Sequence, residues 1–187
     1  LNDNSLVDAF NLHCLKIVKS NINTLSTVEN KIVIVNNSST DNYLHSLELT
    51  NFSILNLSNE DIGKSMQEAY DICAPFADNI ILSGSDVPEL STNHLKNSIK
   101  YLKSFDNYVI ATEDGGFCCF TTKLKNLENV FSRVNYSTDH VLEELIRYQY
   151  NTKRSDFKLV DVDTLNDLQS MYENLKDRSN LSKEQSE

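Results

Sequence analysis

The chain has 187 residues, 40% of them hydrophobic and 24% charged, a composition typical of a single globular domain. Its formal net charge of −10 at pH 7 argues against a surface that binds nucleic acid or anionic lipid by bulk electrostatics, so we expect no nucleic-acid partner. No apolar stretch approaches the roughly 20 residues that a membrane span needs, and no signal peptide opens the chain. We therefore expect a soluble, cytoplasmic protein without a membrane span, and the sequence leaves its oligomeric state open.

The first third of the chain predicts a helix, two strands and a second helix. Residues 3–20 carry apolar side chains at helical spacing. A β-branched run at 31–36 predicts a buried strand that enters a polar loop at 36–39, and 53–57 predicts a weaker strand. A capping-box pattern then predicts a helix from about residue 60 to Ala77.

The rest of the chain continues this alternation. A strand at 79–83 runs into a loop at 84–88, and Ser91 caps the helix that follows. Two more apolar runs predict strands at 108–112 and 117–121. Two short helices, a strand and a final helix are expected in that order, at residues 123–131, 138–149, 157–160 and from Asp163 or Thr164 to about Leu175.

Strands that alternate with crossover helices imply a largely parallel sheet covered on both faces. We therefore expect an α/β fold, a single-domain three-layer sandwich with a mostly parallel sheet. The domain should span residues 1–176, and the polar segment 177–187 should be a disordered tail because it lacks periodicity.

Glycine and acidic residues gather at the ends of predicted strands. Three of the four glycines lie in the segments 84–88 and 113–116, each of which follows an apolar run. In open α/β sheets, ligands bind beyond the carboxyl ends of the strands. The carboxylates of Asp86, Glu113, Asp114 and Asp161 or Asp163 can converge there on a cation such as Mg²⁺ or Mn²⁺. The alternative is two ordinary tight turns, because glycine also supplies positive φ there.

Four segments, in this order along the chain, resemble the motifs of the DUF2064 family. They are Ile80 to Leu90 with its following helix, Val109 to Phe117, Tyr136-Ser137-Thr138, and Asp161 to Leu168. The family is described as glycosyltransferases of the GT-A, nucleotide-diphospho-sugar transferase fold, also called radical-SAM/selenodomain-associated transferase 1. The resemblance covers residues 60 to 168 and implies this fold for the chain.

The resemblance also implies roles for individual acidic residues. Asp86 and Asp163 match metal-binding positions, so they are expected to hold Mg²⁺ or Mn²⁺. Asp114, with Glu113 beside it, matches the D-G-G signature and is expected to act in catalysis on an acceptor hydroxyl or metal. Each aspartate has a simpler structural alternative: a loop or capping carboxylate at Asp86, a β-turn at Asp114 and a helix cap at Asp163.

A wider set of residues is implied to bind the substrates. The partners would be a nucleotide-sugar or nucleotide donor and an unknown small-molecule acceptor. The expected binding residues are Gly84, Ser85, Pro88, Gly115, Gly116, Phe117 and Lys64.

The chain also departs from the family pattern. Members begin with a strand and a basic, glycine-containing loop of the type K-x-P-x-x-G-x-x-K-T-R-L, which would receive the diphosphate. No such segment precedes the first helix here, and the chain opens on Leu1, so we expect an N-terminally truncated form. Ser65 stands where the family usually has an arginine, and Phe117-Cys118-Cys119 replaces a commonly tyrosine-rich strand.

The favoured function is metal-dependent glycosyl transfer from a nucleotide-activated sugar. One alternative is a degenerate GT-A-like domain that binds without catalysis, which would account for the missing loop. Another is a nucleotidyltransferase that acts on a sugar phosphate or cofactor precursor, since such enzymes share the same sheet and metal placement. Fold alone does not separate these activities.

Overall fold

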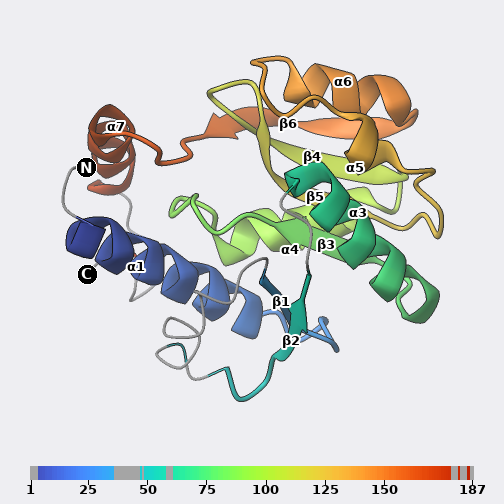
Figure 1. Ribbon diagram of the computed structural model, residues 1–187, viewed down its shortest axis with the longest axis horizontal. Coiled ribbons are helices and arrows are strands. Elements are labelled where there is room, and N and C mark those ends of the chain that lie inside the picture. The colour runs from blue at the N-terminus through green and yellow to red at the C-terminus, as the bar shows by residue number, and fades with distance from the viewer. Residues whose placement is uncertain are drawn as a thin grey trace.

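A computed structural model describes residues 4–35, 47, 49–57, 61–177, 181 and 185 of the chain (Figure 1). The loop expected at 36–39 and most of the expected tail at 177–187 lie outside these residues. The side chain of Gln185 donates a hydrogen bond to the carbonyl oxygen of Pro88 (2.6 Å).

Helices and short strands alternate along the chain, as predicted. In chain order the elements are α1 (Asn4–Asn23), β1 (Ile32–Val35), β2 (Ser53–Asn56), α3 (Ile62–Cys73), the 3₁₀ turn η2 (Ala74–Phe76), β3 (Ile80–Ser83), α4 (Thr92–Tyr101), β4 (Asn107–Thr112), β5 (Phe117–Thr122), α5 (Val130–Arg133), α6 (Val141–Tyr148), β6 (Thr152–Leu159) and α7 (Leu165–Leu175).

The described strands form two sheets. Strands β1 and β2 pair in parallel, and the larger sheet has the order β3-β5-β4-β6. Strand β5 is antiparallel to both of its neighbours, whereas β4 and β6 are parallel, so β3, β4 and β6 all run in one direction. The α/β class is therefore confirmed. The larger sheet is mixed rather than mostly parallel, because the reversed strand β5 makes two of its three pairings antiparallel.

Helices cover both faces of the larger sheet. Strand β4 is therefore buried along its whole length, and its side chains point alternately into two cores. Val109 and Ala111 lie in a core shared with α3, α5 and α6. Tyr108 and Ile110 lie in a second core with Leu95 of α4 and with Leu25, which follows α1. The three-layer arrangement expected from the sequence is thus present.

The helix predicted at 123–131 is wrong in its position, because only Val130–Arg133 is helical. Glu128 and Asn129 have φ values of 47° and 60°, which a right-handed helix excludes. The periodicity that suggested a helix comes from Leu127, Val130 and Phe131, which are all buried. Leu127 lies before the turn at Glu128 and Asn129, whereas Val130 and Phe131 lie in the short helix α5 after it, so this spacing does not come from one continuous helix.

The final strand begins earlier than predicted. Strand β6 spans Thr152–Leu159, whereas the apolar pattern indicated only 157–160. The added part is polar because β6 is an edge strand of the sheet, with one neighbour, β4. At its irregular point, the Ser155 hydroxyl accepts the Ala111 amide (3.1 Å) and so replaces a backbone partner.

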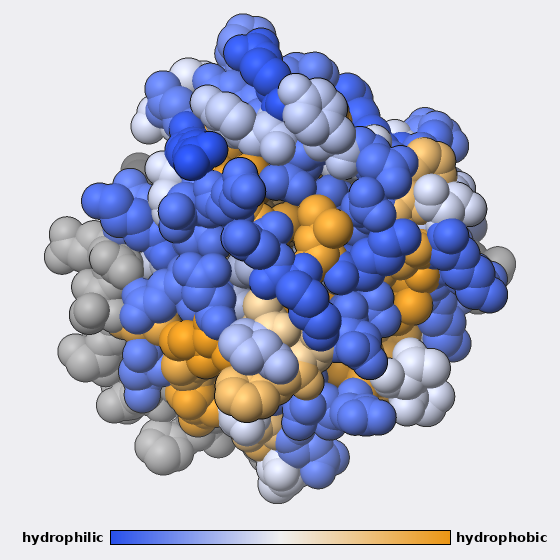
Figure 2. Space-filling model, turned by 90° about the vertical axis from the view of Figure 1, so that its right-hand side faces the viewer, coloured by the Kyte–Doolittle hydropathy of each residue, from blue (hydrophilic) through white to orange (hydrophobic). Residues whose placement is uncertain are grey.

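The surface agrees with the acidic, polar composition. Figure 2 shows the face at the right-hand side of Figure 1, where hydrophilic residues predominate and hydrophobic ones form small, separate patches. Within the described part of the chain, no helix is long and apolar enough to cross a membrane.

Candidate functional site

The first part of the candidate site is the loop that follows β3. The Gly84 amide donates to the Cys118 carbonyl (2.8 Å), which ties the loop to β5. A Cβ atom at Gly84 would lie 2.9 Å from Oδ1 of Asp86, closer than real Cβ contacts come. Glycine at this position therefore lets the Asp86 carboxylate fold back over the end of the strand, and Asp86 remains exposed to solvent.

The second part is the turn between β4 and β5. Oδ1 of Asp114 accepts hydrogen bonds from the Thr112 hydroxyl (2.5 Å) and the Gly116 amide (2.9 Å), so this carboxylate is held in a fixed orientation. Oδ2 of Asp114 has no hydrogen-bond partner among the described residues. Asp114 thus stabilises the expected turn through Oδ1 and still presents Oδ2 to solvent.

Gly115 has a structural requirement of its own. Its φ of +97° is strained for other residues, and a Cβ there would lie 2.0 Å from the Asp139 carbonyl oxygen. The Gly115 carbonyl also accepts the Leu142 amide in the first turn of α6 (3.0 Å). The close backbone approach that the sequence suggested is therefore made to the loop before α6.

The third part is the segment that follows β6. The Val162 amide donates to the Asp86 carbonyl (3.1 Å), which brings this segment beside the loop after β3. Thr164 is the N-cap of α7, and Asp167 completes its capping box. The side chain of Asp163 is therefore not the cap, and it is exposed.

Four carboxylates from these segments, Asp86, Asp114, Asp161 and Asp163, interact electrostatically with one another. The packed atoms around Asp86 partly desolvate its carboxyl group, which raises its pKa, although part of the residue is exposed. The negative charges of Asp163 and Asp114 raise this pKa further. Burial also raises the pKa of Asp161 to about 6, with contributions from Asp114, Asp86 and Asp163. Mutual repulsion of this kind marks a place where a cation would be stabilised.

The other predicted residues of these loops differ in their exposure to solvent and in their contacts. Ser85 and Glu113 are exposed, and the Glu113 amide donates to the Leu159 carbonyl (3.0 Å). Pro88 is buried, whereas the Phe117 ring packs edge-on against Phe120 with centroids 6.4 Å apart.

Lys64 lies in the first turn of α3 and is exposed. Its amide donates to the N-cap Asp61 (2.8 Å), and the adjacent Gly63 packs against Tyr136 and the Phe131 carbonyl. Within the part of the chain that the structure describes, Lys64 forms no ion pair with the four carboxylates.

The donor chemistry suits a hard divalent cation, although no three His, Cys, Asp or Glu among the described residues are gathered closely enough to hold a metal. Burial raises the pKa of the neighbouring Cys118 thiol well above its ordinary value, so the site offers oxygen ligands at neutral pH. Mg²⁺ is commonly held by one or two carboxylates together with substrate phosphates and water. Asp86 and Asp163 would meet this requirement once a substrate supplies the remaining ligands.

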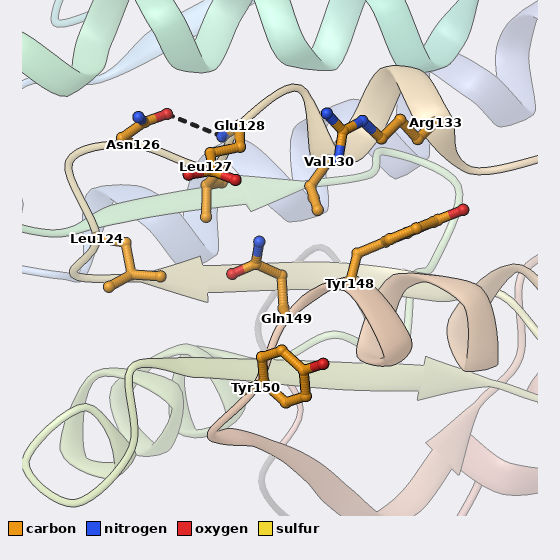
Figure 3. A pocket seen from close by; sticks show the side chains of 9 residues that line it. All are labelled: Leu124, Asn126, Leu127, Glu128, Val130, Arg133, Tyr148, Gln149 and Tyr150. Atoms are coloured by element: carbon orange, nitrogen blue, oxygen red, sulfur yellow. Dashed lines mark hydrogen bonds between the residues drawn. The ribbon is translucent and has the colours of Figure 1, made fainter.

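A separate hollow of about 250 Å³ lies at the opposite end of the larger sheet (Figure 3). Its walls come from the segment between β5 and α5, from α5 itself and from the end of α6 with the residues after it, and they include Leu127, Val130, Arg133, Gln149 and Tyr150. These residues lie beyond the amino end of β4, whereas Asp114 follows its carboxyl end. The hollow is therefore not part of the carboxylate site.

This fold is that of the nucleotide-diphospho-sugar transferases and cytidylyltransferases. A protein from Desulfovibrio desulfuricans G20 described as a candidate nucleotide-diphospho-sugar transferase superposes with a TM-score of 0.68 at 18% identity, covering 90% of this chain and 76% of its own. The 4-diphosphocytidyl-2C-methyl-D-erythritol synthase of Anaerococcus prevotii superposes with a TM-score of 0.67 at 11% identity, covering 87% of this chain and 86% of its own.

The chain belongs to the family DUF2064, described as an uncharacterized protein conserved in bacteria, whose model matches residues 22–138. A curated relative, the 2-phospho-L-lactate guanylyltransferase of Methanobrevibacter smithii, is 27% identical over 158 residues, which cover 82% of this chain and 69% of that protein. The family resemblance drawn from the ordered motifs is thus confirmed.

A metal-containing structure is also among the similar folds. Rv0371c of Mycobacterium tuberculosis H37Rv, in complex with manganese, superposes with a TM-score of 0.58 at 15% identity, covering 86% of this chain and 85% of its own.

Asp161 is an acidic residue to which the family resemblance assigns no role, since it assigns the metal-binding role to Asp163. Its position directly beyond β6, two residues before Asp163, was the available signal. The structure gives it interactions with Asp114, Asp86 and Asp163, so it joins the candidate site on electrostatic grounds.

Proposed function

We propose that this protein is a metal-dependent nucleotidyltransferase, which transfers a nucleoside monophosphate from a nucleoside triphosphate to a small phosphorylated acceptor. The observation that carries the proposal is the mutual electrostatic interaction of the carboxylates that follow β3, β4 and β6. The similarity to a guanylyltransferase supports the nucleotidyl form of transfer, and the cytidylyltransferase folds are consistent with it.

Asp86 and Asp163 are the residues proposed to hold Mg²⁺ or Mn²⁺, with Asp161 beside them. A bound divalent ion would neutralise phosphate charge and stabilise the charge that develops on the leaving group. Lys64 would add a positive charge for the phosphates from the start of α3. Repulsion among the aspartates is relieved when a cation binds, so the same arrangement favours metal uptake.

Asp114 is proposed to orient the acceptor through its unpaired Oδ2, with Glu113 exposed beside it. Gly116 and Thr112 hold the other oxygen, so the carboxylate does not need to be ordered when substrate binds. Ser85, the glycines of both loops, Pro88 and Phe117 would form the walls of the substrate site.

In the proposed reaction, an oxygen of the acceptor phosphate attacks the α-phosphorus of the triphosphate. A new P–O bond forms there, the bond from the α-phosphorus to the bridging oxygen breaks, and pyrophosphate leaves with the electron pair. An acceptor that is already an ionised phosphate loses no proton, so the step needs charge stabilisation more than a strong base.

Glycosyl transfer is the second candidate, favoured by the fold shared with the Desulfovibrio protein. There an acceptor hydroxyl oxygen would attack the anomeric carbon of a nucleotide sugar. The bond from that carbon to the diphosphate would break, a nucleoside diphosphate would leave, and the hydroxyl proton would pass to Asp114.

The leaving group distinguishes the two activities. The protein would be incubated with Mn²⁺ or Mg²⁺ and either the four nucleoside triphosphates plus phosphorylated acceptors, including 2-phospho-L-lactate, or a panel of nucleotide sugars plus alcohol acceptors. Pyrophosphate release with a nucleotidylated product supports the main proposal, whereas nucleoside diphosphate release supports glycosyl transfer.

Two variants make the test specific. Asp86→Asn should abolish turnover, whereas Asp78→Asn should not, because the exposed Asp78 precedes β3 at the opposite end of the sheet and pairs with Lys125 (3.4 Å). Nucleotide binding without any product would favour the degenerate binding domain, and equal activity of both variants would contradict the proposed site.

A further inference from the structure

Glu89 is the one charged residue in the buried class among the described residues, with 1% of its surface exposed. It lies three positions after Asp86 in the same loop. A buried carboxylate is costly unless it accepts hydrogen bonds, so its partners indicate what keeps it there.

One partner lies directly after β6. Oε2 of Glu89 accepts the Val160 amide at 2.9 Å. The carbonyl of Asp86 accepts the Val162 amide at 3.1 Å. The loop after β3 therefore holds the backbone on both sides of Asp161, once through a side chain and once through its own main chain.

The loop itself is anchored from the other side. The side chain of Asn21, in α1, donates to the Leu90 carbonyl at 2.6 Å. Val87 and Leu90 are each 1% exposed and belong to the core that contains Ile110 and Cys119. Glu89 thus connects a segment fixed in the core to the segment that follows β6 and carries Asp161.

We propose that Glu89 is a positioning residue that holds Asp161 against Asp86, so that the carboxylates after β3 and β6 converge on one cation. The inference rests on the proposed function for its metal-binding consequence, while its structural part stands on the contacts of Val160 and Val162. The contact needs a side-chain oxygen that accepts the Val160 amide at 2.9 Å, which the Glu89 carboxyl group supplies.

The test compares wild type, Glu89→Leu and Glu89→Gln in two measurements. Amide hydrogen exchange of Val160 and Val162 reports the connection directly, and titration with Mn²⁺ alone, followed by the paramagnetic resonance of the free ion, reports the metal affinity. Exposed Glu173, in α7, provides the matched control Glu173→Gln.

Glu89→Leu should accelerate exchange at Val160 and weaken Mn²⁺ binding by about 10-fold, the usual scale for residues that orient metal ligands. Glu89→Gln keeps an acceptor oxygen and should restore much of both properties, even if the leucine variant fails to fold. The control should match wild type in both.

The outcomes separate the two proposals. Unchanged Val160 exchange in Glu89→Leu overturns the connection, whatever the activity, and so does exchange in Glu89→Gln as fast as in an unprotected amide. Faster exchange with unchanged Mn²⁺ affinity shows that Glu89 is structural only and overturns the positioning role. A wild-type protein that binds neither Mn²⁺ nor nucleotide overturns the proposed function and the metal-binding consequence together, while the exchange data still decide the structural part.

Discussion

Gly84 controls the position of the Asp86 carboxylate without any special backbone conformation. A methyl group there would lie 2.9 Å from Oδ1 of Asp86 and 3.7 Å from the Cys118 carbonyl, so the carboxylate rather than the backbone would have to move. A substitution at Gly84 should therefore change the geometry of the site without changing the stability of the fold.

Gly84→Ala should therefore weaken Mn²⁺ binding by about 10-fold with little change in melting temperature. Calorimetric titration and thermal unfolding of the same samples would check both parts. A large loss of stability, or an unchanged affinity, would contradict this account of Gly84.

Gly115→Ala should have the opposite balance. Its φ of +97° and the 2.0 Å approach to Asp139 mean that both the backbone and the start of α6 must shift. Strain of this kind costs about 1–3 kcal/mol, and the steric conflict adds to it. Urea unfolding would measure the loss, with Gly84→Ala as the comparison; equal stability of the two variants would argue against the difference.

Asp86 and Asp114 could be predicted because each follows an apolar strand and lies beside glycine. Asp161 was harder, because it and Asp163 follow the same strand two residues apart, and sequence alone does not show how that segment meets the loop after β3. The decisive contacts of Glu89 with Val160, and of Asp86 with Val162, join residues more than 70 positions apart.

Two helices show how the same capping motif acts in different surroundings. Both α4 and α7 begin with a capping box, formed by Ser91 with His94 and by Thr164 with Asp167. Leu95 and Ser98 bury α4 in the core, whereas Leu175 is the buried residue of α7. The packing of each helix should therefore determine how much the loss of its cap lowers the free energy of global unfolding.

Ser91→Ala should lower the free energy of global unfolding by about 1 kcal/mol. Thr164→Ala should mainly increase fraying of α7 and leave the global transition nearly unchanged. Chemical denaturation, together with amide exchange in both helices, distinguishes these effects. Equal losses of global stability would show that α7 is part of the cooperative core.

The elements that the sequence failed to predict share one physical cause. Leu127, Val130 and Phe131 have helical spacing, but the left-handed residues Glu128 and Asn129 separate Leu127 from α5. Asn129 is of a residue type that favours this conformation, whereas Glu128 is not. The first half of β6 lacks alternation because its pairing with β4 comes from long-range contact, and its polar side chains are compatible with an edge position. Strongly apolar β4 and β5 were predicted closely, since burial on both faces leaves a clear pattern.

At the scale of the whole molecule, crowded carboxylates on a chain of net charge −10 should affect stability as a function of pH. The pKa of Asp161 rises from an ordinary 3.8 to about 6 in the folded protein. The folded state therefore binds this proton more tightly than the unfolded state. The resulting stabilisation is complete below pH 3.8 and is lost as the pH rises through 6.

Asp161→Asn should consequently raise the melting temperature at pH 8 and change it little at pH 4. Because Asp161 is partly exposed, solvent screening should limit the gain to about 1 kcal/mol, or roughly 2–4 °C. Asp167→Asn is the opposite control, because hydrogen bonds from Thr164 lower the pKa of Asp167. That variant should lose stability at pH 8 and recover toward wild type in acid; a parallel response of the two would contradict the assignment.

The reversed direction of β5 has a consequence for the order in which the protein folds. Strands β4 and β5 form a hairpin in which Ile110 pairs with Cys119, only nine residues away, and the turn of this hairpin carries Asp114. Strand β6 must instead bring Thr152 to Asn107, across 45 residues of chain. Closing the longer loop costs more entropy, so we expect the hairpin to form first and the segment with Asp161 and Asp163 to join later. During synthesis on the ribosome, the turn with Asp114 would then emerge after Asp86 but before Asp161 and Asp163, so the hairpin could form before the last two carboxylates are available.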